Sequence, residues 1–125
     1  MDASQKKILV AEDDEIVLVL ICALLARYSY AVDPATDAAA TEELLARENY
    51  DAVLFDLNLP NGGVDFLRQT VQRYPALEKK LIVLTARADD ARQLTGLRFA
   101  ALLRKPVEIY ELIETVQRCI CGERE

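Results

Sequence analysis

The stretch that decides the fold is DAVLFDLNLP, residues 51–60. Four apolar residues, 52–55, lead to a single acid, Asp56; Asn58 follows two positions later, and Pro60 closes the segment. A short apolar run bounded by turn residues is typical of a buried strand. The question is which other groups of the chain can reach a carboxylate at the end of so apolar a strand.

Similar short apolar segments recur along the chain and alternate with segments of helical character. The predicted strands are Lys7–Ala11, Tyr30–Val32, Ala52–Asp56, Leu81–Ala86 and Ala100–Pro106. The predicted helices run from the acids at 12–15 to about Tyr28, over 38–48 behind a cap at Asp37, and over Val64–Tyr74, Asp89–Leu97 and Glu108–Ile120.

Strands that alternate with helices through short loops form a parallel sheet with helices on both faces. Strands buried on both faces read as continuous apolar runs, as these do. We therefore expect one doubly wound α/β domain over residues 1–125, with its core at about 7–121. Its class is the flavodoxin-like (βα)5 three-layer sandwich around a five-stranded parallel sheet.

The composition limits the possible functions. The chain has 125 residues, a formal net charge of -6 and no basic stripe, which argues against direct nucleic-acid binding or a hold on an anionic membrane. The longest apolar run, 16–26, is too short to span a bilayer. Three cysteines and no signal-peptide pattern favour free thiols and a cytoplasmic location, and Cys119 and Cys121 are expected on or beside the last helix.

Polar residues collect at the carboxyl ends of the predicted strands, where ligands bind in open parallel sheets. They are Glu12 and Asp13 after the first strand, Asp56 after the third, Thr85 after the fourth and Lys105 after the fifth. Clustered carboxylates need neutralisation, and oxygen ligands suit Mg²⁺. With the lysine, such a site would attract a phosphoryl group, which a carboxylate could accept as an aspartyl phosphate.

Four segments carry a resemblance to a known family. ILVAEDDE, DAVLFDLNLP, LIVLTA and LLRKP resemble, in order and spacing, the signatures of the response-regulator receiver domain. The resemblance implies Asp56 as phosphoacceptor and Mg²⁺ held by Glu12, Asp13, Asp56 and the backbone carbonyl of Asn58. It implies Thr85 as the switch hydroxyl, Lys105 as the partner of the phosphoryl group, and a cis bond before Pro106. The donor would be a phosphohistidine of a sensor histidine kinase or a histidine phosphotransfer protein.

The chain departs from the family pattern in the region before Lys105. The family usually has an aromatic residue three positions before the lysine, where this chain has Leu102, so the coupling of Thr85 to that ring is in question. Phe99 is either a displaced aromatic or a core residue, and we expect a core residue. The loop after Asp56 and the segment 85–105 are also shorter than usual, so the signalling face is expected to be atypical.

The first helix is apolar nearly all round. We expect a buried stripe of Val17, Leu20, Ile21, Leu24 and Leu25 and an outward face of Ile16, Leu18, Val19, Cys22 and Ala23. The outward face is either tolerated surface or a contact with a kinase helix or a second copy of this domain.

Three other functions remain open at this point. The main alternative is a protein-interaction module that works without phosphate, which Leu102 would permit. A phosphatase with an aspartyl phosphate intermediate would need a second acid where Asn58 stands. A nucleotide-binding domain would need a glycine-rich loop after the first strand. The set of acids, Thr85 and Lys105 favours a signalling receiver over all three. We therefore expect a signalling module and not an enzyme that acts on other substrates.

Overall fold

The computed structural model describes residues 5–87 and 90–122. The strands are β1 (Lys7–Ala11), β2 (Ala31–Ala35), β3 (Ala52–Asp56), β4 (Leu81–Thr85) and β5 (Ala101–Arg104). The helices are α1 (Glu15–Arg27), α2 (Ala38–Arg47), α3 (Val64–Arg73), the 3₁₀ helix η1 (Pro75–Lys79), α4 (Asp90–Gln93) and α5 (Ile109–Cys121). Strands and helices thus alternate, as the sequence pattern predicts.

All five strands are parallel and form one sheet in the order β2-β1-β3-β4-β5. Strand β3 lies at the centre, and Val53 pairs with Leu9 on one side and Leu81 on the other. Every residue of β3 and β4 is buried, which explains their unbroken apolar sequence. The sheet places the carboxyl ends of β1, β3, β4 and β5 at one edge.

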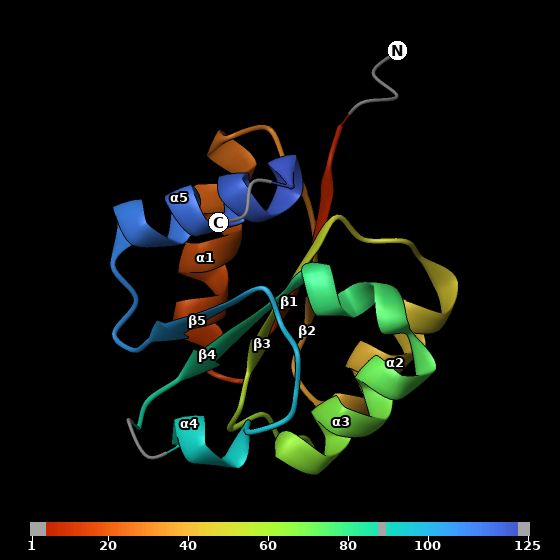
Figure 1. Cartoon of the computed structure of the whole chain (residues 1–125). Helices are drawn as coiled ribbons and strands as arrows, with labels where there is room; N and C mark the ends of the chain where they lie inside the picture. Colours follow the sequence, from red (N-terminus) through yellow and green to blue (C-terminus); the bar gives the residue numbers. More distant parts are fainter. Residues whose placement is uncertain (1–4, 88–89, 123–125) are drawn as a thin grey trace.

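Helices cover both faces of the sheet (Figure 1). Strand side chains alternate between the faces. Ile8, Leu54 and Leu84 pack with residues of α1 and α5, whereas Phe55 and Val83 pack with residues of α2 and α3. Burying one such side chain stabilises the fold by roughly 1.5–3 kcal/mol. The predicted doubly wound, flavodoxin-like fold is therefore confirmed.

Strand β2 differs from its prediction. It covers Ala31–Ala35 rather than Tyr30–Val32, and it contains Pro34. Because β2 is an edge strand, the missing N–H of a proline can face outward without breaking the ladder. A proline therefore does not end a strand at this position.

Two helix starts follow their acidic caps. Asp37 accepts a hydrogen bond from the backbone N–H of Ala40 at 2.8 Å, as predicted for the cap of α2. Asp14 accepts from the N–H groups of Ile16 and Val17 at 3.0 and 3.1 Å and so caps α1. These bonds satisfy donors that a helix leaves free at its first turn.

The predicted buried stripe of α1 is partly wrong. Leu18, expected to face outward, is buried with Ile21 and Leu25, whereas Leu20 is 64% exposed. The helix is apolar on every side, so the sequence pattern does not fix its rotation about its axis. The packing against β1 and β3 fixes it instead.

The segment around α4 and β5 is shorter than predicted. Helix α4 ends at Gln93 rather than Leu97, and β5 ends at Arg104, before a cis bond between Lys105 and Pro106. The start expected at Asp89 lies outside the described residues. The 3₁₀ helix η1 begins at Pro75 and was not predicted.

Helix α5 confirms most of its apolar stripe. Leu112, Ile113 and Val116 are buried, and Cys119 and Cys121 lie in its last turn, where the Cys119 thiol donates to the Lys79 carbonyl at 3.4 Å. Ile109 is an exception, with 56% of its surface exposed. It is the first residue of the helix and lies next to α1 without being covered by it.

Candidate functional site

Asp56 is held at the end of the central strand. It is the last residue of β3 and only 1% exposed. Its Oδ1 accepts a hydrogen bond from the backbone N–H of Asn58 at 2.9 Å, and its Oδ2 accepts one from the Lys105 ammonium at 2.8 Å. The apolar strand thus fixes the carboxylate, and two donors orient its two oxygens.

Lys105 joins two buried carboxylates. Its Nζ lies 2.8 Å from Asp56 Oδ2 and 2.7 Å from Glu12 Oε1, and Glu12 is fully buried. The other oxygen of Glu12 accepts a hydrogen bond from the N–H of Asp14 at 3.1 Å. The lysine is therefore the cation that permits two acids to lie together at the end of the sheet.

The pKa values of this group reflect burial and pairing. Burial raises the pKa of Glu12, and its hydrogen bonds with Lys105 and the Asp14 N–H only partly offset that effect. Burial alone would lower the pKa of Lys105, but its hydrogen bonds with Asp56 and Glu12 outweigh burial, so its pKa is raised. Lys105 is therefore firmly cationic, and Glu12 is harder to ionise than an ordinary glutamate.

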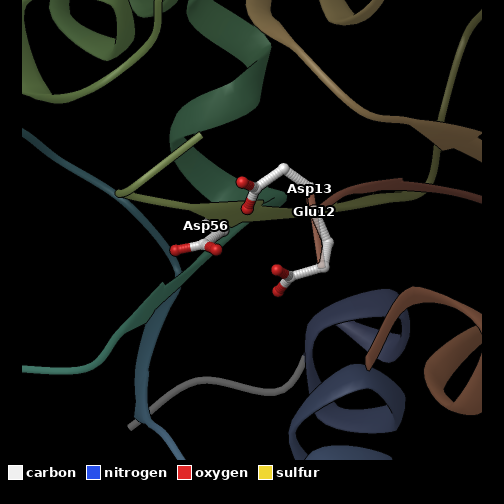
Figure 2. A group of neighbouring side chains, drawn as sticks. All are labelled: Glu12, Asp13 and Asp56. Carbon is white, nitrogen blue, oxygen red and sulfur yellow. The ribbon is translucent and has the colours of Figure 1, made fainter. Parts of the chain in front are cut away.

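Three carboxylates converge beside this ion pair. One oxygen from each of Glu12, Asp13 and Asp56 lies within 4.8 Å of the others, and Figure 2 shows the three side chains around a common space. Asp13 is exposed, so the group is open to solvent. Glu12 Oε1 is buried, and Lys105 is its one partner among the described residues. Oxygen donors in such a set, with an under-used buried carboxylate, fit a hard divalent cation such as Mg²⁺.

The loop after β3 turns back tightly beside the site. The Leu59 N–H donates to the Asp56 carbonyl at 3.0 Å, which folds the chain back directly after the strand. Gly62 lies under this turn, where a Cβ would approach Leu59 O and Phe55 Cζ to 3.1 Å each. Asn58 is thereby held at the rim of the site, with its side chain exposed.

Thr85 is at the predicted strand end, but its hydroxyl bonds away from the carboxylates. Its Oγ1 lies 2.5 Å from Asp90 Oδ2 and 3.1 Å from the Arg87 carbonyl, and it accepts from the Arg87 N–H at 3.2 Å. No hydrogen bond joins it to Asp56 within 5–87 and 90–122. The sequence pattern therefore found the position of Thr85 but not its partner.

Asp90 is the site-adjacent residue that sequence reasoning missed. It lies in the first turn of α4, and the sequence pattern predicts it only as part of a helix. The available signal was an acid five residues after the strand-end threonine. Nothing in periodicity or capping patterns predicts that such an acid turns back toward the strand.

An apolar groove adjoins the site. It has a volume of about 780 Å³ and lies between α1 and α5, and Val17, Leu20, Ile109 and Lys105 are among the residues that line it. The same two helices also carry exposed apolar side chains at Ile16, Val19 and Tyr110. The outward apolar face expected for α1 thus exists, although with Leu20 in place of Leu18.

Phe99, which precedes β5, and Leu102 of β5 lie near the core that α2 and α3 cover. Both are partly buried and pack against the cluster that contains Leu94 and Val83. Phe99 thus packs against the core, as expected, but it stays partly exposed.

Comparison with curated proteins finds response regulators. The chain is 32% identical over 114 residues to "Response regulator protein PilR" of Pseudomonas aeruginosa, covering 90% of this chain and 26% of that protein. It is 34% identical over 114 residues to "Transcriptional regulatory protein DltR" of Streptococcus agalactiae, covering 89% of this chain and 50% of that protein. The chain thus spans a quarter to a half of the length of these relatives.

Comparison with solved structures finds the same fold. A CheY-like response regulator receiver domain protein from Methanospirillum hungatei superposes with a TM-score of 0.86 at 25% identity, covering 95% of this chain and 96% of that one. The signal receiver domain of an HD domain-containing protein from Pseudomonas fluorescens gives a TM-score of 0.84 at 25% identity, covering 94% and 88%.

The model of the family "Response regulator receiver domain" matches residues 8–117, which is nearly all of the chain. The match includes every residue of the acid, threonine and lysine group at the strand ends. Because both the sequence and the fold agree over this span, the chain belongs to the response regulator receiver domain family.

Proposed function

We propose that Asp56 accepts a phosphoryl group from a phosphohistidine and so controls a partner or output domain. The observation that carries this proposal is the geometry of Asp56: a buried strand-end carboxylate with one oxygen on the Lys105 ammonium and the other on a backbone N–H. Both donors hold the carboxylate in place, and Lys105 is also positioned to meet negative charge that develops on a transferring group.

In the proposed reaction an Asp56 oxygen attacks the phosphorus. The new P–O bond forms as the P–N bond to the donor imidazole breaks, and the imidazole nitrogen keeps the electron pair and takes up a proton. Lys105, now 2.8 Å from Asp56, would then pair with a phosphoryl oxygen. Thr85 would donate its hydroxyl to a second phosphoryl oxygen after its hydrogen bond to Asp90 is broken.

We propose that Mg²⁺ is held by Glu12, Asp13, Asp56 and the backbone carbonyl of Asn58. When bound, the ion would offset the negative charge of the carboxylates and of the phosphoryl oxygens. Asp13, the exposed member, is the ligand that solvent reaches most easily. Glu12 has a second task, since it also holds Lys105.

The α1–α5 groove is the surface we propose for the donor, either a sensor kinase or a phosphotransfer protein. Lys105, which contacts Asp56, is one of the residues that line the groove, so a helix seated there would bring its histidine near the phosphoacceptor. The exposed face of Val19 and Leu20 gives that helix an apolar contact. A second copy of this domain on the same face is the alternative occupant.

The proposed unit is one receiver domain with its core at about 7–121, in the cytoplasm. No helix within the described ranges is both long and apolar enough to span a bilayer. Cys22 and Cys121 are free thiols, which suits a reducing compartment.

Intact mass after incubation with Mg²⁺ and acetyl phosphate tests phosphoryl acceptance. We expect the wild type to gain one phosphoryl group and Asp56→Asn to gain none, because an amide cannot act as the nucleophile. An unmodified wild type would instead favour the phosphate-independent interaction module.

Charge substitutions on α1 test the groove. Val19→Glu with Leu20→Glu should slow phosphoryl transfer from a phosphohistidine protein but leave uptake from acetyl phosphate unchanged, because only the first needs docking. Ala39→Glu, an exposed position on α2 across the sheet, is the matched control. Equal transfer rates in all three proteins would exclude this face as the donor site.

A further inference from the structure

The hydroxyl of Thr85 is held by a single strong acceptor. Thr85 is 1% exposed, and its Oγ1 lies 2.5 Å from Asp90 Oδ2, against 3.1 Å from the Arg87 carbonyl. A hydroxyl has one proton to donate, and bonds to a carboxylate are shorter and stronger than bonds to a neutral carbonyl. The proton therefore goes to Asp90.

This bond competes with the role proposed for Thr85. The same proton cannot be donated to Asp90 and to a phosphoryl oxygen on Asp56. A phosphoryl group is doubly charged and offers three strong acceptor oxygens, so it can outcompete one carboxylate. Donation of the Thr85 hydroxyl to a phosphoryl oxygen therefore requires it to leave Asp90.

Asp90 also belongs to the helix that would feel this change. It is the first residue of α4, a helix of four residues, Asp90–Gln93. The other end of α4 is held from α3, because Arg68 Nη2 donates to the carbonyls of Gln93 at 2.7 Å and Thr95 at 2.9 Å. In Figure 1, α4 lies beside α3 at the carboxyl end of β4. The helix is thus fixed at one end by α3 and at the other by the hydroxyl of Thr85.

We propose that Asp90 is a positioning residue that holds Thr85 in the unphosphorylated state and passes the movement of its hydroxyl to α4. This inference rests on the proposed function, because it requires a phosphoryl group at Asp56. It provides a route from the site to the surface without a ring at position 102. Leu102 packs in the core cluster instead.

Beryllium fluoride, an analogue of a bound phosphoryl group, tests the competition with Mg²⁺ present. We expect Asp90→Ala to bind it about three- to tenfold more tightly than the wild type, since one competing hydrogen bond is removed. Asp90→Asn, with a neutral acceptor, should fall between the two. Asp65→Ala removes an exposed acid from the first turn of α3 and should bind as the wild type does.

The Thr85→Val background separates this role from a merely structural one. If Asp90 acts through the Thr85 hydroxyl, Asp90→Ala has no effect on beryllium fluoride affinity once Thr85 is valine. An equal gain in both backgrounds, or no gain in either, would overturn the proposal. Failure of the proposed function has a different signature, because then the wild type would not bind the analogue, or Asp56→Asn would bind it equally well.

Amide hydrogen exchange tests the link to α4. Beryllium fluoride should raise exchange in residues 90–95 of the wild type at least twofold, because the N-terminal contact of α4 is lost. In Thr85→Val the same residues should already exchange fast and should not respond. Unchanged exchange in the wild type with the analogue bound would show that α4 is not coupled to Thr85.

Discussion

The two sides of the site are built in different ways. Asp56 ends a central strand that is buried on both faces, and the Lys105 ammonium lies 2.8 Å from it and 2.7 Å from Glu12. Thr85 ends the next strand, but beyond it the described chain has a four-residue helix, joined to the rest of the domain by the bond at Asp90, by Arg68 and by the buried Leu94 that follows it. The acceptor side is therefore fixed by the sheet, while the switch side depends on a few local hydrogen bonds and on the packing of Leu94. A receiver needs both, because the chemistry requires fixed groups and the signal requires a part that moves.

The largest expected effect comes from the sheet beneath the acceptor. Leu54→Ala should lower the free energy of unfolding by about 2–5 kcal/mol, because it opens a cavity under the fully buried centre of β3. Urea unfolding measures this. Leu20→Ala removes the same atoms from an exposed leucine and should lower the free energy of unfolding by less than about 0.5 kcal/mol. Similar losses in the two variants would contradict the assignment of a rigid acceptor side.

The next largest effect concerns the shared cation. Lys105→Met should slow phosphoryl uptake from acetyl phosphate by about 100-fold or more, because the donor to the developing charge is lost. Initial rates of mass gain measure it, and Lys6→Met, an exposed lysine, should match the wild type. A fall of less than threefold in Lys105→Met would remove this lysine from the proposed chemistry.

A smaller effect follows from the raised pKa of Glu12. Between its ordinary pKa of 4.5 and the raised folded value, the folded state binds more protons than the unfolded state. Stability from this group is thus full below 4.5 and is lost as pH rises through the folded pKa. Without Mg²⁺, the wild type should lose stability relative to Glu12→Gln on going from about pH 4.5 to about pH 7.5. Urea unfolding across this range measures the difference, and a constant or widening advantage of the wild type would contradict the sign.

The smallest effect tests the switch side. Arg68→Ala should lower the free energy of unfolding by only about 1 kcal/mol, because its two hydrogen bonds are at the surface. Amide exchange in residues 93–97 should nevertheless rise, since the C-terminal end of α4 loses its support. Arg98→Ala, an exposed neighbour, is the control. No rise in exchange would mean that Arg68 does not hold this end of α4.

The difference between the two sides also explains what the sequence could predict. The strands β1 and β3 have the predicted bounds because unbroken apolar runs report burial on both faces directly. The same topology brings Glu12, Asp13, Asp56 and Lys105 together, since parallel strands end at one edge.

The remaining features depend on tertiary contacts. The rotation of α1 is set by packing on the sheet, because an apolar surface on all sides leaves Leu18 and Leu20 equivalent in the pattern. The Thr85–Asp90 bond depends on how a short loop turns, and neither periodicity nor capping rules determine that.

The central claim is that Asp56, and no other acid of the cluster, carries the phosphoryl group. Borohydride reduction of the phosphorylated wild type converts a carboxyl that bears phosphate to an alcohol, and peptide mass spectrometry then locates it. The account predicts homoserine at position 56 alone. Reduction at Glu12 or Asp13, with Asp56 intact, would contradict it.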